Sequence, residues 1–338
     1  MLILSLGADM RRREFITFLG GAMALAPRAV CAQQSSDRVR RIGVLSTGLQ
    51  TPVTAAGYPL FVAQLRQLGF TEGSNLAIDF RALDQNDSRK TFIDAADMRG
   101  KVDVIVALGS EVFLQAAIAA DDTVPIVMTA FNFDPIERGY VKSLARPGGN
   151  VTGVTFRQPE LASKQIELLR EAFPARTRLA IFYDGQSTDQ FSAAETAAKS
   201  MRLDFQAVKL ENPPYDFDKA FQSVEQGKAD MLLVLSSGYF SLHRAQIALL
   251  AGQQHLPTMF IFSTYVEAGG LMSYGVDFLP SYRRAAESVA KILRGAKPAD
   301  LPVEQVTNFE LAVNLRTAKA IGVELPTSIL LRANKVIE

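Results

Sequence analysis

The sequence predicts an α/β fold of two doubly wound parallel-sheet lobes joined by three crossovers. From Arg41 onward, short apolar runs of strand length alternate with longer amphipathic segments, which is typical of parallel sheets covered by helices on both faces. The same rhythm starts again after a glycine-rich stretch, RPGGNVTGVTF at 146–156. Beyond Gly269 the chain has more elements than one lobe holds simply, so we expect its tail to return to the first lobe and then to the second.

In the first half of the chain, strands and helices are expected to alternate. Runs with the length and β-branching of buried strands lie at 41–46, 76–80, 102–109 and 124–131. Apolar residues at helical spacing lie between them, at 58–68, 88–99 and 111–120. This half therefore predicts a βαβαβαβ unit with one parallel sheet.

The second half repeats the pattern and then adds a tail. Strands are expected at 178–184, 204–210, 229–237 and 257–263, and helices at 162–173, 190–201, 217–226 and 242–254. The tail predicts a short strand, a helix, a strand and a helix, at 269–278, 279–293, 301–314 and 315–322. We expect lobe 1 to comprise 37–152 plus about 276–300, and lobe 2 to comprise 153–275 plus about 301–338.

The first 32 residues have the pattern of an export signal. The basic cluster Arg11–Arg13 is followed by the apolar run Phe15–Ala26, which is too short to span a bilayer. Val30 and Ala32 supply the residues of a cleavage site after Ala32, and the paired arginines resemble the twin-arginine motif. We therefore expect a cleaved signal peptide at 1–32 and a periplasmic protein. A disordered tail and a lipoprotein signal using Cys31 are the alternatives.

Composition and charge exclude several classes of protein. The 36 basic and 35 acidic side chains give no electrostatic footprint for nucleic acid. The two histidines, His243 and His255, have no cysteine or second histidine at ligand spacing, so we expect no metal and no cofactor. After residue 32 no apolar run approaches 18 residues, and we expect no membrane span.

Candidate ligand-binding residues follow the predicted strands, because ligands of open parallel sheets bind outside the carboxyl ends of the strands. Taken alone, each residue is more typical of a helix N-cap or a wall of the core. Together, the hydroxyls at helix N-termini suit a carboxylate and the aromatic rings suit an apolar body. The set comprises Ser46, Thr47, Gly109, Ser110, Phe131, Asn132 and Phe133 in the first lobe, and Asp184, Ser236, Ser237 and Tyr239 in the second.

Catalytic signatures are missing from the sequence. The segment after the first strand fails the G-x-G-x-x-G spacing, and neither G-x-x-x-x-G-K-[ST] nor G-x-S-x-G occurs. A Ser–His–Asp triad would have only two histidines to use. Asp184 and Glu267 could form a glycosidase pair in principle, but nothing in their spacing supports one. We therefore expect a binding protein and not an enzyme.

Several segments together resemble the ABC transporter substrate-binding family of the tryptophan/tyrosine type. They are RREFITFLGG, RIGVLS, RPGGNVTGVT, GGLMSYG, LPVEQVTNFELAVNLRTAKAIG and ANKVIE, and they run from the signal to the C-terminus. The resemblance implies a type I periplasmic-binding fold and a monomer that delivers small molecules to an inner-membrane permease. Relatives are associated with aromatic amino acids and aromatic carboxylates.

The resemblance also implies site residues. It carries over Ser46, Thr47, Gly109, Ser110, Phe131, Asp184, Ser236 and Ser237, and it adds Tyr274 at the late crossover. The chain departs from the family at Glu111, where a small residue or proline is commoner. The segment TAFNFDP, with Phe131, Asn132 and Phe133, departs as well. These differences concern the ligand and not the fold.

The leading hypothesis is capture of a small aromatic or amino-acid-like carboxylate by hinged closure of the two lobes. Ser110 and Ser237 would hold the carboxylate, Phe131, Phe133 or Tyr239 would flank the apolar body, and Asp184 would take an ammonium. Gly149, Gly153 and Gly275 are the expected hinge glycines, although Gly153 fits close backbone packing equally well. The alternatives are a partner that presents its ligand to a sensor, a secreted hydrolase or transferase, and a structural protein without a ligand.

Overall fold

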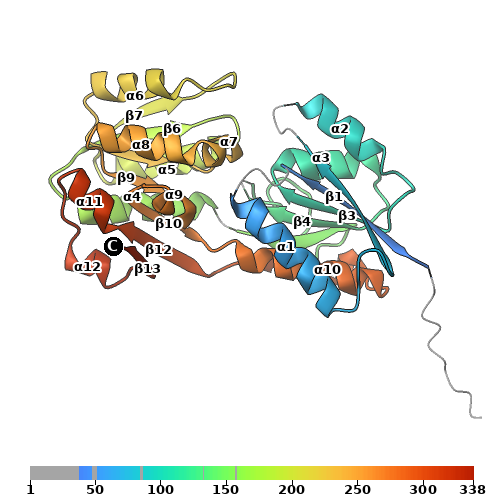
Figure 1. Ribbon diagram of the computed structural model, residues 1–338. Helices are drawn as coiled ribbons and strands as arrows, with labels where there is room; N and C mark the ends of the chain where they lie inside the picture. Colours follow the sequence, from blue (N-terminus) through green and yellow to red (C-terminus); the bar gives the residue numbers. More distant parts are fainter. Residues whose placement is uncertain (1–37, 48–51, 84–86, 132, 157) are drawn as a thin grey trace, which may run out of the picture. The chain divides into compact units, whose positions relative to one another are not determined.

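The computed structural model describes residues 38–47, 52–83, 87–131, 133–156 and 158–338 (Figure 1). Val39–Glu338 forms one unit. The predicted signal peptide at 1–32, with Cys31 and the cleavage site after Ala32, lies outside the described residues, as does Asn132. Within the described ranges, no helix is long and apolar enough to cross a membrane.

The first sheet has six parallel strands in the described part of the chain. Its order is β11-β5-β4-β3-β1-β2, and neighbouring strands pair in parallel throughout. The parallel pairing confirms the predicted α/β class. The strands are β1 (Arg40–Ser46), β2 (Leu76–Ala82), β3 (Val104–Gly109), β4 (Ile126–Ala130), β5 (Val151–Thr155) and β11 (Glu304–Gln305).

Helices cover both faces of this sheet, which explains why β1, β3 and β4 carry buried runs without alternation. Val44 and Val104 pack into the cluster formed with α1 (Pro52–Gln67) and α10 (Leu279–Leu293). The neighbouring Leu45 and Ile105 face the opposite cluster, which includes side chains of α2 (Ser88–Ala96) and α3 (Glu111–Ala120). Figure 1 shows α1 and α10 side by side, although they are far apart in the sequence.

The second sheet has seven strands among the described residues, in the order β13-β12-β10-β9-β8-β6-β7. All pairs are parallel except β10–β12. The strands are β6 (Arg178–Tyr183), β7 (Asp204–Lys209), β8 (Met231–Val234), β9 (Thr258–Phe260), β10 (Met272–Val276), β12 (Phe309–Asn314) and β13 (Lys335–Ile337).

Two apolar clusters hold helices against this sheet. One cluster includes side chains of α4 (Gln158–Ala172), α5 (Thr188–Ser200), α11 (Leu315–Ala320) and α12 (Thr327–Leu330). The other includes side chains of α6 (Phe217–Gln226), α7 (Gly238–Leu242), α8 (Arg244–Gln253) and α9 (Ser263–Glu267). The helix predicted at 242–254 corresponds to α8, and α7 is a short additional helix that ends directly before it, at Leu242. The core of each lobe lies between its sheet and its helices.

The described chain crosses between the sheets three times: after β5, between β10 and α10, and between β11 and β12. The antiparallel pair follows from the last two crossings. β10 leaves the second sheet at Val276, and β12 re-enters directly opposite, at Phe309. A strand that returns at the end where its neighbour leaves must run the other way, because a parallel strand would need a long crossover connection.

The glycine-rich stretch, in which the sequence places the boundary between the lobes, contributes a strand to the first sheet. Val151–Thr155 is β5, and it pairs with β4 over its whole length, from Ile126↔Val151 to Ala130↔Thr155. Glu304–Gln305 pairs with the other edge of β5. The sequence places the start of lobe 2 at residue 153, inside β5, and assigns 301–338 to lobe 2, whereas all of β5 and β11 belong to the first sheet. A β-branched run beside the open edge of β4 satisfies its backbone hydrogen bonds by joining the sheet.

Candidate ligand-binding cleft

The strand ends of the first lobe present a hydroxyl at a helix N-terminus. Ser46 is buried at the end of β1 and Thr47 is half-buried beside it. Gly109 ends β3 with φ +110, and its amide nitrogen donates to Thr129 Oγ1 at 3.0 Å. Ser110 is the N-cap of α3, and its half-buried side chain makes no capping hydrogen bond within the described chain. Its hydroxyl is therefore available to a ligand at the positive end of the helix.

Asp184, which follows β6 in the second lobe, is fully buried and surrounded by donors. Oδ1 accepts from the Gln186 amide at 2.9 Å and from Ser187 Oγ at 3.1 Å. Oδ2 accepts from the Tyr215 hydroxyl at 3.2 Å and from Ser237 Oγ. Four donors satisfy the carboxylate from within the described protein, which differs from the expectation that Asp184 takes a ligand ammonium.

The Tyr215 hydroxyl remains a donor to Asp184 over a wide pH range. Burial raises the pKa of Tyr215, and the nearby Asp184 charge raises it further. Ser237 Oγ also accepts from the Tyr239 amide at 3.1 Å as the N-cap of α7. Asp184 and Ser237 therefore hold the loops after β6, β7 and β8 together.

Ser236 and Tyr239 are also bound within the second lobe. The Ser236 amide donates to Gln190 Oε1 at 3.0 Å, and its carbonyl accepts from Gln190 Nε2 at 3.4 Å. Gln190 lies on α5 and was not a sequence candidate, since a buried glutamine in an alanine-rich helix carries no distinguishing pattern. The half-buried Tyr239 ring lies 4.4 Å from Tyr215 and 4.7 Å from His243, centroid to centroid.

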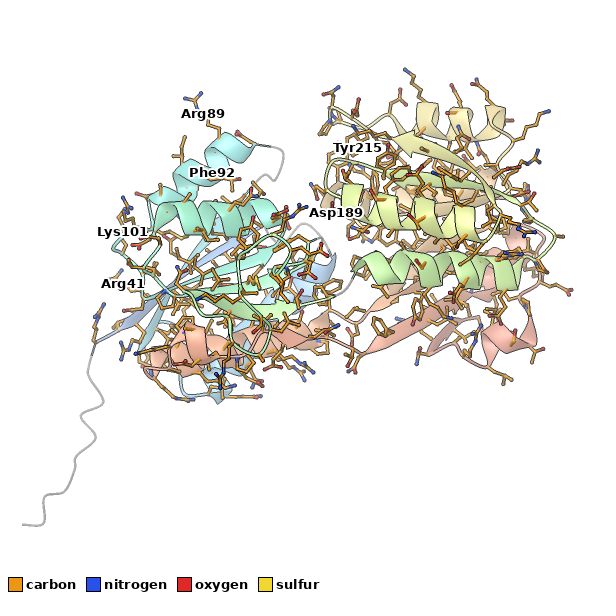
Figure 2. The ribbon with its side chains drawn as sticks, turned by 180° about the vertical axis from the view of Figure 1, so that it is seen from behind. Arg41, Arg89, Phe92, Lys101, Asp189 and Tyr215 are labelled. Carbon is orange, nitrogen blue, oxygen red and sulfur yellow. The ribbon has the colours of Figure 1, made fainter. Side chains whose placement is uncertain are left out.

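A pocket of 240 Å³ brings the N-termini of α3 and α5 together. Both helices begin after a parallel strand, and both direct backbone N–H groups outward. Figure 2 shows Asp189 at the start of α5. Of the predicted residues, Ser110 lines this pocket. The full lining is Ser110, Glu111, Val112, Gln115 and Arg138 from the first lobe, and Gly185, Gln186, Thr188 and Asp189 from the second.

The charged side chains of the pocket form one connected network. Arg138 lies 2.7 Å from Asp189 and 3.3 Å from Glu111, nitrogen to oxygen. The Tyr140 hydroxyl donates to Glu111 Oε1 at 2.7 Å. Burial and this bond to Glu111 raise the pKa of Tyr140 to about 12, so the phenol keeps its proton. The residues that line the pocket thus include two carboxylates, Glu111 and Asp189, and one guanidinium, Arg138.

Phenylalanine rings gather where the chain crosses between the sheets. The Phe278 ring centroid lies 4.2 Å from that of Phe131, 4.5 Å from Phe156 and 4.7 Å from Phe262. The predicted residues Phe131 and Tyr274 both pack against this cluster. Phe278 was missed, because its run LMSYGVDF was interpreted as a strand. Its position directly before a proline-containing helix start could have marked it.

The predicted ligand contacts Phe133 and Tyr274 lie in different surroundings. Phe133 is buried in the first-lobe core, with its ring 5.7 Å from Tyr140. This differs from the expectation that it flanks a ligand. Tyr274 is half-buried, and its ring stacks on Phe309 at 5.9 Å. Asn132 lies outside the described residues.

The expected hinge glycines occupy two kinds of position. A Cβ at Gly153, where φ is +138, would lie 2.0 Å from the Met128 carbonyl oxygen, and a Cβ at Gly275 would lie 2.0 Å from that of Ile261. Both glycines are strand residues that permit close approach of a neighbouring backbone. Gly149 is exposed, and a Cβ there would meet nothing within 4 Å in the described chain.

The glycosidase alternative finds no support in the geometry. Asp184 is held by its four donors, whereas Glu267 Oε1 lies 2.5 Å from Lys335 Nζ on the surface. Both carboxylates are therefore engaged with other protein groups. No cluster of three or more potential metal ligands occurs among the described residues.

Comparisons with known proteins agree with this architecture. The sequence model of the family described as ABC transporter substrate binding protein matches residues 50–337. The tyrosine-binding protein of Clostridioides difficile (strain R20291) is 28% identical over 293 residues, which cover 86% of this chain and 83% of that protein.

Two solved structures have the same fold. A conserved domain protein from Vibrio cholerae is 25% identical with a TM-score of 0.79, over 88% of this chain and 100% of that chain. An ABC domain from Streptococcus pneumonia, solved in complex with L-Trp, is 24% identical with a TM-score of 0.77, over 88% of this chain and 99% of that chain. These likenesses confirm the predicted two-lobe fold.

Proposed function

Because the chain belongs to the ABC transporter substrate-binding protein family and has its type I periplasmic-binding fold, we propose that it is the periplasmic solute-binding subunit of an importer. It captures a small aromatic amino acid between its lobes and delivers it to an inner-membrane permease. The ligand stabilises the closed form because that form places groups of both lobes on one molecule. The predicted signal peptide at 1–32 supports the periplasmic location.

The observation that carries this proposal is the pocket between the starts of α3 and α5. Ser110 contributes a hydroxyl that caps no amide in the described chain, at the N-terminus of a ten-residue helix. Helix N-termini favour carboxylates through their free N–H groups and their dipole. The ligand carboxylate accordingly binds at Ser110 and the first turn of α3.

The charges of the pocket favour an amino acid over a simple aromatic acid. Glu111 and Asp189 outnumber Arg138 among the charged lining residues, so an ammonium group is attracted to this wall. These two carboxylates replace Asp184 as the proposed ammonium partners, because the oxygens of Asp184 are already satisfied. Phe131 and its neighbours at the crossovers supply the apolar wall. Relatives named for tyrosine binding and solved with L-Trp support the same ligand class.

A fluorescence titration with L-tryptophan tests the proposal. The chain has no tryptophan and eight tyrosines, so the indole emission comes from the ligand alone and tyrosine can transfer energy to it. We expect a saturable blue shift of the indole emission and a rise in the melting temperature, because ligand binding stabilises the folded state. If L-tryptophan, L-tyrosine and L-phenylalanine all leave emission and melting unchanged, the proposed ligand class is wrong.

A further inference from the structure

Arg138 connects the two lobes from a rigid turn. Asp134 Oδ1 accepts from the Ile136 and Glu137 amides at 2.7 and 3.2 Å, and the Arg138 amide donates to the Asp134 carbonyl at 3.1 Å. Gly139 follows with φ +76, in the left-handed region that favours glycine. These contacts fix the backbone at Arg138, from which its side chain reaches Asp189 in the first turn of α5.

Glu111 holds the guanidinium of Arg138 from the side of the first lobe. Glu111 Oε1 accepts from the Tyr140 hydroxyl at 2.7 Å and lies 3.3 Å from Arg138 Nε. Gln115 Nε2 donates to the same Tyr140 hydroxyl at 3.1 Å. The Arg138 side chain is thus placed by its own lobe before it meets Asp189, so less side-chain entropy is lost when the cross-lobe pair forms.

We propose that Arg138 and Asp189 form a cross-lobe ion pair that closes the ligand-free pocket, and that the charged headgroup of a zwitterionic ligand replaces this pair. Arg138 then binds the ligand carboxylate together with Ser110, and Asp189 binds the ligand ammonium. The inference rests on the proposed function for the ligand class. It makes Arg138 and Asp189 the residues that select the headgroup.

The exchange conserves charge pairing for an amino acid and not for a simple anion. When a zwitterion binds, the Arg138–Asp189 pair breaks, and two pairs form: Arg138 with the ligand carboxylate and Asp189 with the ligand ammonium. An aromatic acid without an amino group would also take Arg138, but it would leave Asp189 unpaired within the same pocket as Glu111. The carboxylates of Asp189 and Glu111 would then repel each other without the guanidinium that they share, so the pocket binds the anion more weakly than the zwitterion although its carboxylate fits.

The ligand-free pair is weak enough to be displaced. The side chains of Arg138 and Asp189 are 44% and 48% exposed, and exposed ion pairs change an equilibrium by about two- to five-fold. Such a pair shifts the population of closed molecules without locking them. It also weakens with salt, because exposed charges are screened within about 10 Å at 0.1 M ionic strength.

The test compares Asp189→Asn with a matched control. Lys164→Gln removes a pair within α4, Lys164–Glu167, whose side chains are 45% and 48% exposed, so it controls for the loss of one exposed ion pair. The probes are L-tryptophan and indole-3-propionate, which differ by the ammonium group. Titrations give the affinity ratio of the two probes, and small-angle scattering gives the radius of gyration without ligand.

We expect Asp189→Asn to lower the preference for L-tryptophan over indole-3-propionate by about two- to five-fold and to increase the ligand-free radius, whereas Lys164→Gln changes neither. The swapped variant Arg138→Asp with Asp189→Arg should restore the ligand-free radius. Unchanged preference and radius in Asp189→Asn, with the wild type still binding L-tryptophan, would overturn the inference and leave the proposed function standing. If the wild type binds neither probe, the proposed function and the headgroup exchange both fail, and the scattering comparison still decides whether the pair closes the pocket.

Discussion

The polar residues at the strand ends of the two lobes differ in whether the protein itself satisfies their hydrogen bonds. In the first lobe, Ser110 begins α3 with a hydroxyl that makes no capping bond in the described chain. In the second lobe, the donors of Ser187, Tyr215 and Ser237 converge on the buried carboxylate of Asp184. A polar group that the protein already satisfies shapes the site, whereas one that it leaves available can bind a ligand. The substitutions below test this contrast.

The largest effect is expected at Asp184. Asp184→Ala would leave the buried Ser187 and Ser237 hydroxyls and the Tyr215 phenol without their shared acceptor, and unsatisfied buried donors cost about 1–3 kcal/mol each. We expect the free energy of unfolding, measured in urea, to fall by about 3–5 kcal/mol. A loss below about 1 kcal/mol, with ligand binding abolished, would instead return Asp184 to the role of a ligand contact.

The glycines of the two sheets should come next. Gly153→Val places a Cβ 2.0 Å from the Met128 carbonyl oxygen in β4, and Gly275→Val places one 2.0 Å from the Ile261 carbonyl oxygen directly after β9. We expect each to lower the free energy of unfolding by about 2–4 kcal/mol. Gly149→Ala is the matched control, because a Cβ there meets nothing within 4 Å among the described atoms, and its effect should stay within about 0.5 kcal/mol. If Gly153→Val is stable and only closure is impaired, Gly153 is a hinge.

Ser110→Ala should weaken ligand binding without lowering the stability of the fold. Loss of one hydrogen bond to a charged ligand group costs about 1.5–3 kcal/mol, so we expect the affinity for L-tryptophan to fall by about tenfold or more. The melting temperature without ligand should match that of the wild type, because the hydroxyl makes no capping bond in the described chain. A variant with a lower melting temperature and an unchanged affinity for L-tryptophan would instead indicate that Ser110 stabilises the start of α3.

The smallest effect is expected from His243. Burial lowers its pKa in the folded protein, so the unfolded chain binds the proton more tightly. The stability linked to His243 is complete above the unfolded pKa of about 6.5 and declines as the pH falls below it. Urea midpoints between pH 7.5 and pH 5.5 should therefore fall slightly more in the wild type than in His243→Gln. An equal fall of the urea midpoint in both proteins would contradict the lowered pKa of His243.

Most of the fold follows from the sequence, because buried parallel strands read as short apolar runs and their covering helices as amphipathic ones. The predicted lobe boundary falls inside β5, because Val151–Thr155 looks the same as a segment between lobes until its partner strand is known. β11 is only two residues long and carries no periodic signal. The antiparallel β12 depends on where two distant crossings emerge, which a local pattern does not record.

The site is less predictable, because its composition depends on which polar groups the protein satisfies internally. Ser110 was found through its place after β3. Asp184 was chosen in the same way, and its internal donors carry no local pattern because they come from three separate loops. Arg138 and Asp189 had no motif, as one lies in a turn and the other in the first turn of a helix. Glu111 gave the one sequence signal of this network, as a departure from the usual small residue.

A crystal structure of the chain with L-tryptophan would test the central claim most directly. The ligand carboxylate should lie within hydrogen-bonding distance of Ser110 Oγ at the start of α3, with the ammonium against Glu111 or Asp189. Asp184 should keep its four donors. An ammonium bound to the Asp184 carboxylate, with Ser110 and the start of α3 free of ligand, would contradict the account.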